Sequence, residues 1–227
     1  MGKLTNHVAL VTGAGTGLGR AIAIAFAKEG ATVVLNGRRE EKLREVEREI
    51  GEGKGKAIVI PADLTDETAV HALRDKLLNS TDGKLDILVN NAGGVSAMNS
   101  ISELTLEQWN QMMDLNLTSQ FLATKAFLPA LRKSGNGKII SVTSGMANFH
   151  MNGFGAYSAS KSGVEALMKT VAAEEKDNGI QVNLFDPINV ISEGNPSGEK
   201  DPAEIVATLI DLAAASSMEK SGEVVKP

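Results

Sequence analysis

The sequence of 227 residues contains no cysteine, one tyrosine and one tryptophan. The absence of cysteine excludes disulfide bonds, thiolate metal ligands and cysteine nucleophiles, and it agrees with a reducing cytoplasm. Basic residues are in the minority, with 23 Lys and Arg against 28 Asp and Glu and a formal net charge of −5. This balance argues against a broad surface for nucleic acids or anionic membranes, both of which need clustered positive charge.

Long apolar runs are also missing. No stretch approaches the roughly 18 to 20 apolar residues that a membrane-spanning helix needs, and the first residues show no charged-then-apolar leader. We therefore expect a soluble, cytoplasmic protein with small-molecule partners. The hydrophobic content of 42% suffices for one sizeable core. No low-complexity linker or internal repeat divides residues 1–227, so we expect a single domain.

Short β-branched segments alternate along the chain with longer segments of helical periodicity. The pattern predicts strands at 8–12, 31–36, 56–62, 85–90, 137–144 and 180–187, with a last strand near 222–225. It predicts helices at 17–29, 40–50, 66–79, 107–133, 156–177 and 202–216. Because the strands are almost continuously apolar, both of their faces should be covered, as in a parallel sheet. The sequence therefore predicts an α/β fold with a doubly wound sheet of about seven strands.

A glycine-rich segment, TGAGTGLG at 12–19, joins the first predicted strand to the first helix. Glycines let a pyrophosphate approach the backbone amides at a helix N-terminus. The spacing of Gly13, Gly17 and Gly19 does not satisfy the strict G-x-G-x-x-G dinucleotide fingerprint. A turn that merely packs a strand against its helix is therefore the alternative interpretation.

The end of the second predicted strand indicates the cofactor. It reads LNGRREE and lacks the acidic residue that would bind the ribose 2′-hydroxyl of NAD, whereas Arg38 and Arg39 could accommodate a 2′-phosphate. Arginines at a helix N-terminus oppose the helix dipole, which a bound phosphate would offset. We favour NADP(H), with NAD(H) left open. The alternative is that both arginines are solvated and pair with nearby glutamates.

The segment YSASK places Tyr157 and Lys161 on one face of a predicted helix. A nearby ammonium favours the phenolate, which a free tyrosine with a pKa of about 10 does not form at neutral pH. In an arbitrary helix, however, such a pair is more often ordinary surface chemistry.

Two further polar residues complete the candidate site. Ser144 ends the fifth predicted strand and could hydrogen-bond an oxygen that gains negative charge, although it could instead cap the next turn. Ser141 and Thr143 are its competitors. Asn116 lies in an apolar helical stretch, where its amide could support catalysis or tie two helices together.

Together these motifs resemble the short-chain dehydrogenase/reductase family over nearly the whole chain. The resemblance implies a Rossmann-type fold, hydride transfer between NAD(P) and a carbonyl or secondary alcohol, and a homo-oligomer, either a dimer or a tetramer. It implies that Tyr157 transfers the proton, Ser144 orients the oxygen, Lys161 binds the nicotinamide ribose and lowers the tyrosine pKa, and Asn116 supports a proton relay. It implies no metal. The implied cofactor contacts are Gly13, Thr16, Gly17, Leu18, Gly19, Arg38, Asp63, Leu64, Asn90, Ala92, Gly93, Tyr157, Lys161 and Pro187.

The chain departs from the family pattern after the sixth strand. It reads Pro187-Ile188 where members usually read Pro-Gly, and the substrate loop at 188–201 is short. The segment 145–155 would line the substrate side, and Met146, Phe149, His150, Met151 and Phe154 would give it an apolar character, with His150 read as a solvated or hydrogen-bonded residue rather than a second catalytic base. A short lid suggests either an open site for bulky or carrier-linked carbonyl substrates or a site that has lost efficient catalysis. We favour the first, because all of the candidate catalytic residues are present.

These features lead to one main functional hypothesis, a reductase of the 3-oxoacyl thioester type. The same residues would also suit another alcohol, sugar or steroid dehydrogenase. A protein that senses a dinucleotide without catalysis is the alternative of a different class.

Overall fold

A computed structural model of the protein describes residues 2–216 and 221–227. Within these residues seven strands form one sheet in the order β3-β2-β1-β4-β5-β6-β7, and every neighbouring pair is parallel. The predicted doubly wound α/β fold is therefore confirmed. The strands are β1 (Val8–Thr12), β2 (Thr32–Asn36), β3 (Lys56–Val59), β4 (Ile87–Asn90), β5 (Lys138–Val142), β6 (Gln181–Phe185) and β7 (Val224–Val225).

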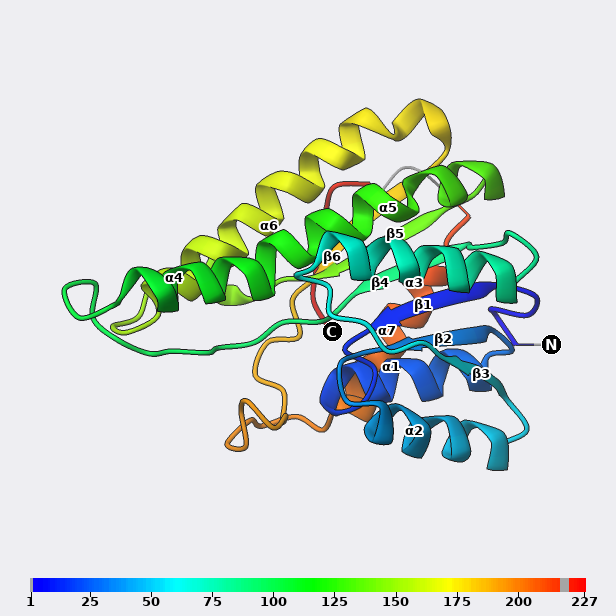
Figure 1. Ribbon diagram of the computed structural model, residues 1–227, viewed down its shortest axis with the longest axis horizontal. Coiled ribbons are helices and arrows are strands. Elements are labelled where there is room, and N and C mark those ends of the chain that lie inside the picture. The colour runs from blue at the N-terminus through cyan, green and yellow to red at the C-terminus, as the bar shows by residue number, and fades with distance from the viewer. Residues whose placement is uncertain (1, 217–220) are drawn as a thin grey trace.

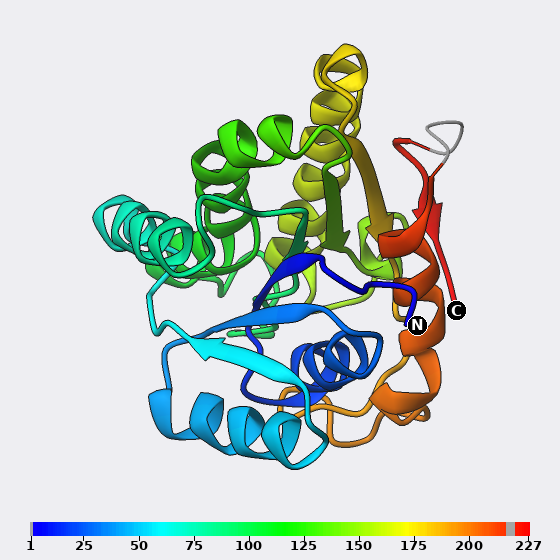
Figure 2. The same cartoon turned by 90° about the vertical axis from the view of Figure 1, so that its right-hand side faces the viewer.

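Helices cover both faces of the sheet, as Figure 2 shows. The first face carries α1 (Gly17–Lys28), α2 (Glu40–Glu52) and α7 (Pro202–Ala214), and the second carries α3 (Glu67–Ser80), α5 (Ser119–Ser134) and α6 (Gly155–Glu174). The helix predicted at 107–133 is not continuous. It divides into α4 (Leu106–Met113), a π turn η1 (Asp114–Thr118) and α5.

The core forms two apolar layers, one on each side of the sheet. Neighbouring strand residues alternate between them: Val11 packs toward α1 and α7, whereas Leu10 packs toward α5 and α6. This alternation explains why the strands are apolar without a polar face. Burying such a side chain contributes about 1.5–3 kcal/mol. None of the helices in the described residues combines the length and apolarity that crossing a membrane requires.

The strand order creates the place for a ligand. The chain passes from β1 to β2 and β3 on one side and then returns to β4 on the other side of β1. At this reversal the loops after β1 and β4 separate, and open α/β sheets bind ligands there, at the carboxyl ends of the strands. The loops after β4, β5 and β6 all leave the sheet at this end, on the left of Figure 1.

Candidate active site

A cavity of about 1500 Å³ opens at the carboxyl ends of the strands. Small-ligand pockets usually measure about 300–1,000 Å³, so this cavity has room for an extended cofactor and a substrate. Almost all of the site residues predicted from the sequence line it. These are Gly13, Thr16, Gly17, Leu18, Gly19, Arg38, Asp63, Leu64, Ala92, Gly93, Ser144, Tyr157, Lys161 and Pro187.

Bare backbone forms one end of this cavity. Gly13 and Gly17 have φ of +64° and +52°, in the region that favours glycine. A Cβ at Gly19 would lie 2.2 Å from the carbonyl oxygen of Gly13, so no side chain fits there. The side-chain oxygen of Thr12 accepts hydrogen bonds from the backbone amides of Asn91 and Ala92, which ties this loop to the one after β4. The loop also opens α1, so its geometry fits the pyrophosphate of a dinucleotide.

The basic residues after β2 lie beside this loop. Arg38 is exposed and lines the cavity. Burial acts to raise the pKa of Asp63, but hydrogen bonds from Thr65 and the charge of Arg38 bring it below its usual value. Arg39 forms an ion pair of 2.6 Å with Glu193, in the loop after β6. Both partners are largely exposed, so the pair contributes little stability, but it fastens that loop across the cofactor end of the cavity.

Lys161 is the most deeply buried ionisable group among the four candidate catalytic residues, Asn116, Ser144, Tyr157 and Lys161. Its side chain comes from α6, its residue is only 3% exposed, and its ammonium donates a 2.9 Å hydrogen bond to the carbonyl of Val142. Burial lowers the pKa of Lys161 to about 8. Its Nζ lies 5.7 Å from the ring centre of Tyr157, which confirms that the two side chains share one helix face.

The π turn positions Asn116. Its side-chain oxygen accepts a hydrogen bond from the amide of Gly94, and its side-chain nitrogen donates to the carbonyls of Gly94 and Met112. The amide thus holds the loop after β4 rather than tying two helices together. A Cβ at Gly93 would lie 2.7 Å from Asn116 Oδ1 and 3.5 Å from Lys161 Nζ, so both side chains flank this glycine.

Tyr157 and Ser144 lie next to each other in the lining of the cavity. Burial raises the pKa of Tyr157, the hydrogen bond with Ser144 lowers it, and the negative charge of Asp186 raises it further. We expected Lys161 to lower this pKa, but the net direction in the structure is upward because burial dominates. Ser144 also accepts a hydrogen bond from the amide of Met146, so it caps the turn that follows, as the alternative interpretation predicted.

The structure separates Ser144 from its competitors. Ser141 is buried, where it accepts a hydrogen bond from the side-chain amide of Asn90, and Thr143 donates to Glu165. Asn90 itself differs from the expectation: its side chain binds Thr124 and Ser141 inside the protein. The cavity is lined instead by the following residue, Asn91.

The substrate side of the cavity is apolar, as the sequence indicated. Met146, Phe149, Met151 and Phe154 line it, and Phe149 and Met151 are 63% and 51% exposed. His150, expected in the same lining, is exposed and lies outside it. Ile188 also lines the cavity, with φ of +61°. A left-handed conformation is strained for a β-branched residue, and glycine would adopt it freely. The chain has thus kept the backbone geometry that usually requires glycine and added a side chain at the mouth of the site.

Sequence reasoning missed four charged residues of this cavity: Lys42, Asp186, Glu193 and Lys226. An acidic residue at the carboxyl end of a predicted strand was a usable signal for Asp186. Glu193 and Lys226 approach only through tertiary contacts. The described residues contain no cluster of three His, Cys, Asp or Glu side chains that could hold a metal ion.

Comparisons with known proteins agree with this geometry. The family model described as short chain dehydrogenase matches residues 7–202. A 3beta-hydroxysteroid dehydrogenase from Mediterraneibacter gnavus is 38% identical over 94% of this chain and 76% of its own length. A metagenomic short-chain oxidoreductase in complex with NADP has a TM-score of 0.88 at 33% identity, covering 99% of both chains. A 7 alpha-hydroxysteroid dehydrogenase complexed with NADH and 7-oxo glycochenodeoxycholic acid has a TM-score of 0.92 at 27% identity, covering 99% of this chain and 93% of its own.

Proposed function

The chain belongs to the short chain dehydrogenase family, and we propose that it is an NADP(H)-dependent oxidoreductase that interconverts a carbonyl and a secondary alcohol. One observation carries this proposal. Ser144, Tyr157 and Lys161 meet at one end of a cavity whose other end is formed by the glycine loop and Arg38. A dinucleotide that lies along this cavity brings its nicotinamide to the three polar side chains.

Each of the candidate residues would then have its own role in the reaction. The bound dinucleotide supplies or accepts the hydride. The Tyr157 phenol donates its proton to the substrate oxygen in reduction and regains it in oxidation. The Ser144 hydroxyl orients that oxygen, because it already hydrogen-bonds with Tyr157. Lys161 fixes the ribose and holds a positive charge near the phenol, and Asn116 supports the loop of Gly93 and Gly94 beside them.

Cofactor preference rests on the basic end of the cavity. Arg38 lines it in an exposed position, where its guanidinium can meet a 2′-phosphate bidentately. The end of β2 has no acidic residue that would favour NAD. The relatives include complexes with NADP and with NADH, so NAD(H) is retained as the second cofactor to test.

The predicted substrate is a 3-oxoacyl thioester. The short loop 188–201 and the exposed apolar rim at Phe149 and Met151 suit a long or carrier-linked substrate that enters from solvent. The same rim suits a ketosteroid, and the names of two relatives favour this second candidate. A dinucleotide sensor without turnover is the remaining alternative.

The test is NADPH consumption, followed by absorbance, with a 3-oxoacyl thioester and a ketosteroid as separate acceptors. Native protein and Tyr157→Phe are compared side by side. Turnover that collapses in the variant supports the enzyme and its proton donor, and the active acceptor identifies the substrate class. Binding of NADPH by both proteins without turnover on any carbonyl would instead favour the sensor.

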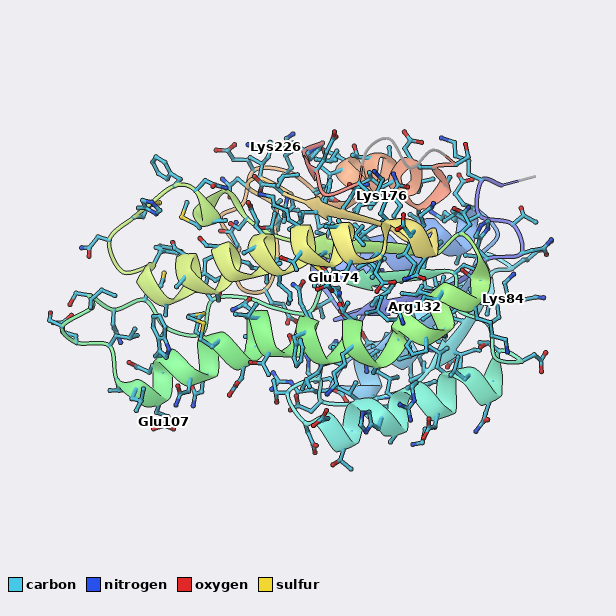
Figure 3. The ribbon with its side chains drawn as sticks, turned by 90° about the horizontal axis from the view of Figure 1, so that it is seen from above. Lys84, Glu107, Arg132, Glu174, Lys176 and Lys226 are labelled. Atoms are coloured by element: carbon cyan, nitrogen blue, oxygen red, sulfur yellow. The ribbon has the colours of Figure 1, made fainter. Side chains whose placement is uncertain are left out.

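We also propose that the protein is a homo-oligomer. A second hollow, of about 340 Å³, lies on η1, α5 and α6, and Leu117, Phe121 and Leu167 make it apolar. These helices run side by side along one surface (Figures 1 and 3), and Phe121 is 44% exposed there. Light scattering after size exclusion should give a smaller mass for Phe121→Asp than for native protein. Leu106→Asp, at an exposed position of α4, is the control.

A further inference from the structure

Glu165 is a buried acid on α6, the helix that also carries Tyr157 and Lys161. The residue is 6% exposed. Residues four positions apart lie on one helix face, so Tyr157, Lys161 and Glu165 occupy successive turns of the same face. The proposed reaction gives a role to the first two of these residues and none to the third. A charged side chain in such a buried place needs partners, and its partners indicate what it holds.

The partners of Glu165 come from the two ends of one short segment, residues 143–148, which we call the serine turn. At its start, the hydroxyl of Thr143 donates a 3.2 Å hydrogen bond to Glu165 Oε1. At its end, the side-chain amide of Asn148 donates to Oε1 at 3.3 Å and to Oε2 at 3.4 Å. Ser144 lies between these two residues and lines the cavity. One carboxylate therefore connects both ends of the segment that carries Ser144.

Two other hydrogen bonds attach the serine turn to α6. The ammonium of Lys161 donates to the carbonyl of Val142, the residue before the turn, and the hydroxyl of Ser162 donates to the carbonyl of Ala147 at 2.7 Å. Ser162 is exposed, whereas Thr143 is only 2% exposed. Because a hydrogen bond is stronger where water is excluded, the contact between Thr143 and Glu165 is the firmer of the two that act within the turn.

Stability alone does not account for a carboxylate at this position. Lys169, one turn further along α6, has its Nζ 3.2 Å from Glu165 Oε2, but the lysine side chain is half exposed. Water weakens such a pair. Replacing a buried ion pair by an apolar side chain is often neutral or even stabilising. The hydrogen bonds to Thr143 and Asn148 are therefore the better explanation of the buried acid.

We propose that Glu165 is a positioning residue that holds the serine turn against α6 and so fixes the Ser144 hydroxyl relative to Tyr157. Its catalytic meaning rests on the proposed function. Tyr157 is carried by α6 and Ser144 by the loop after β5, so a contact between these two elements sets the distance between the two groups. A displacement of about 1 Å in an active site can lower a rate about 100-fold.

Three variants separate positioning from folding. Glu165→Met removes both acceptor oxygens but keeps an unbranched side chain of similar length and helix propensity. Glu165→Gln removes the charge but keeps an oxygen that can accept from Thr143, so it tests rescue by the conservative change. Thr143→Val removes the donor and leaves the carboxylate in place. The matched controls are Glu174→Met and Glu174→Gln, at an exposed position at the end of α6 that Figure 3 labels.

Amide hydrogen exchange, followed by mass spectrometry on peptides that cover 145–149, reports on the serine turn without substrate or cofactor. The amide of Met146 donates to Ser144 Oγ, and the amide of Asn148 donates to the carbonyl of Gly145. We expect this segment to exchange about tenfold faster in Glu165→Met and about threefold faster in Thr143→Val, as when a hydrogen bond to a charged group is lost. Glu165→Gln and the controls should exchange at the native rate, and β1 should be unchanged in every variant.

Kinetics with the active acceptor complete the test. The kcat of Glu165→Met should fall about 10–100-fold, with the KM for NADPH unchanged and most of the kcat restored in Glu165→Gln. Exchange at the native rate in both Glu165→Met and Thr143→Val overturns the proposal, and so does faster exchange with an unchanged kcat. Equally fast exchange in β1 would show a general loss of structure and also overturn it. If Glu165→Met does not fold, Thr143→Val decides by the same measurements. Because exchange requires no turnover, its result is distinct from a failure of the NADPH test.

Discussion

Because the charged side chain of Lys161 is buried, we expect it to lower the free energy of unfolding of the native protein. The ammonium has a carbonyl partner, Val142, and within the described residues it has no carboxylate partner. Lys161→Met replaces it with an unbranched apolar side chain of similar length. We expect this variant to be inactive but more stable than the native protein at neutral pH.

The magnitude follows from the pKa of Lys161, which burial lowers from 10.5 to about 8. This difference corresponds to a cost of about 3 kcal/mol for keeping the lysine charged in the folded state. Loss of the hydrogen bond to Val142 offsets about 1 kcal/mol of the gain. The free energy of unfolding of Lys161→Met should therefore exceed that of the native protein by about 2 kcal/mol at pH 7.

The sign of the pH dependence is fixed by proton binding. Between pH 8 and 10.5 the unfolded chain binds more protons at Lys161 than the folded chain does, so native stability rises with pH relative to the variant. The difference of about 2 kcal/mol should shrink to near zero by about pH 10. All other titrating groups are shared by the two proteins, so the difference isolates Lys161.

The assay is urea unfolding at one protomer concentration, at several pH values from neutral to alkaline. Exposed Lys176→Met, labelled in Figure 3, is the control and should show a small difference that does not change with pH. The reasoning is refuted if Lys161→Met is less stable than native protein at pH 7. It is equally refuted if the difference between them stays constant with pH.

Three further changes have defined outcomes. Gly19→Ala forces the loop backbone to move, so it should lower the free energy of unfolding by about 1–3 kcal/mol. It should also abolish the binding of NADPH, which is measured by the fluorescence of the cofactor. Ser144→Ala should reduce kcat about 100-fold or more with the active acceptor. Glu193→Gln releases Arg39 for a phosphate, so calorimetry should show NADP binding about 2–5-fold tighter, with NAD affinity unchanged.

Each of these outcomes has a counterpart that would contradict it. Gly51, in α2, has open space where a Cβ would lie, so Gly51→Ala should leave NADPH binding intact. Equal behaviour of Gly19→Ala and Gly51→Ala would contradict the close approach at the loop. A decrease in kcat of less than about tenfold in Ser144→Ala would show that the Ser144 hydroxyl is not a catalytic group. Equal changes in NADP and NAD affinity would show that Glu193 does not compete for the phosphate position.

Much of the fold could be predicted because the parallel strands are buried on both faces. Continuous β-branched runs such as 8–12 and 32–36 have no other stable place than the middle of a covered sheet. The last strand was placed correctly but is only two residues long. The break in the helix predicted at 107–133 was not visible, because one π turn barely changes the apolar periodicity.

Site residues could be predicted where a motif specifies one residue type at one position. The prediction was less reliable where two adjacent residues could both reach the cavity. Asn90 is the last residue of β4 and the identical Asn91 is the first residue of the loop that follows, so their side chains point to different places. Nothing in the motif indicates which of them reaches the cavity. Asp186 and Lys226 meet because β7 pairs with β6, a long-range contact that local patterns do not encode.

The π turn at η1 has a genetic consequence. Such a turn closes between residues i and i+5, so it holds one residue more than the α-helical turn it replaces. Deleting the codon of Leu115 or Leu117 would remove this extra residue, so the turn would close as an ordinary α-helical turn and α4 would continue into α5 as one regular helix. The Asn116 amide would then swing away from Gly94 although its own codon is intact. The position of the Asn116 side chain therefore depends on the number of residues in this turn as well as on their identity.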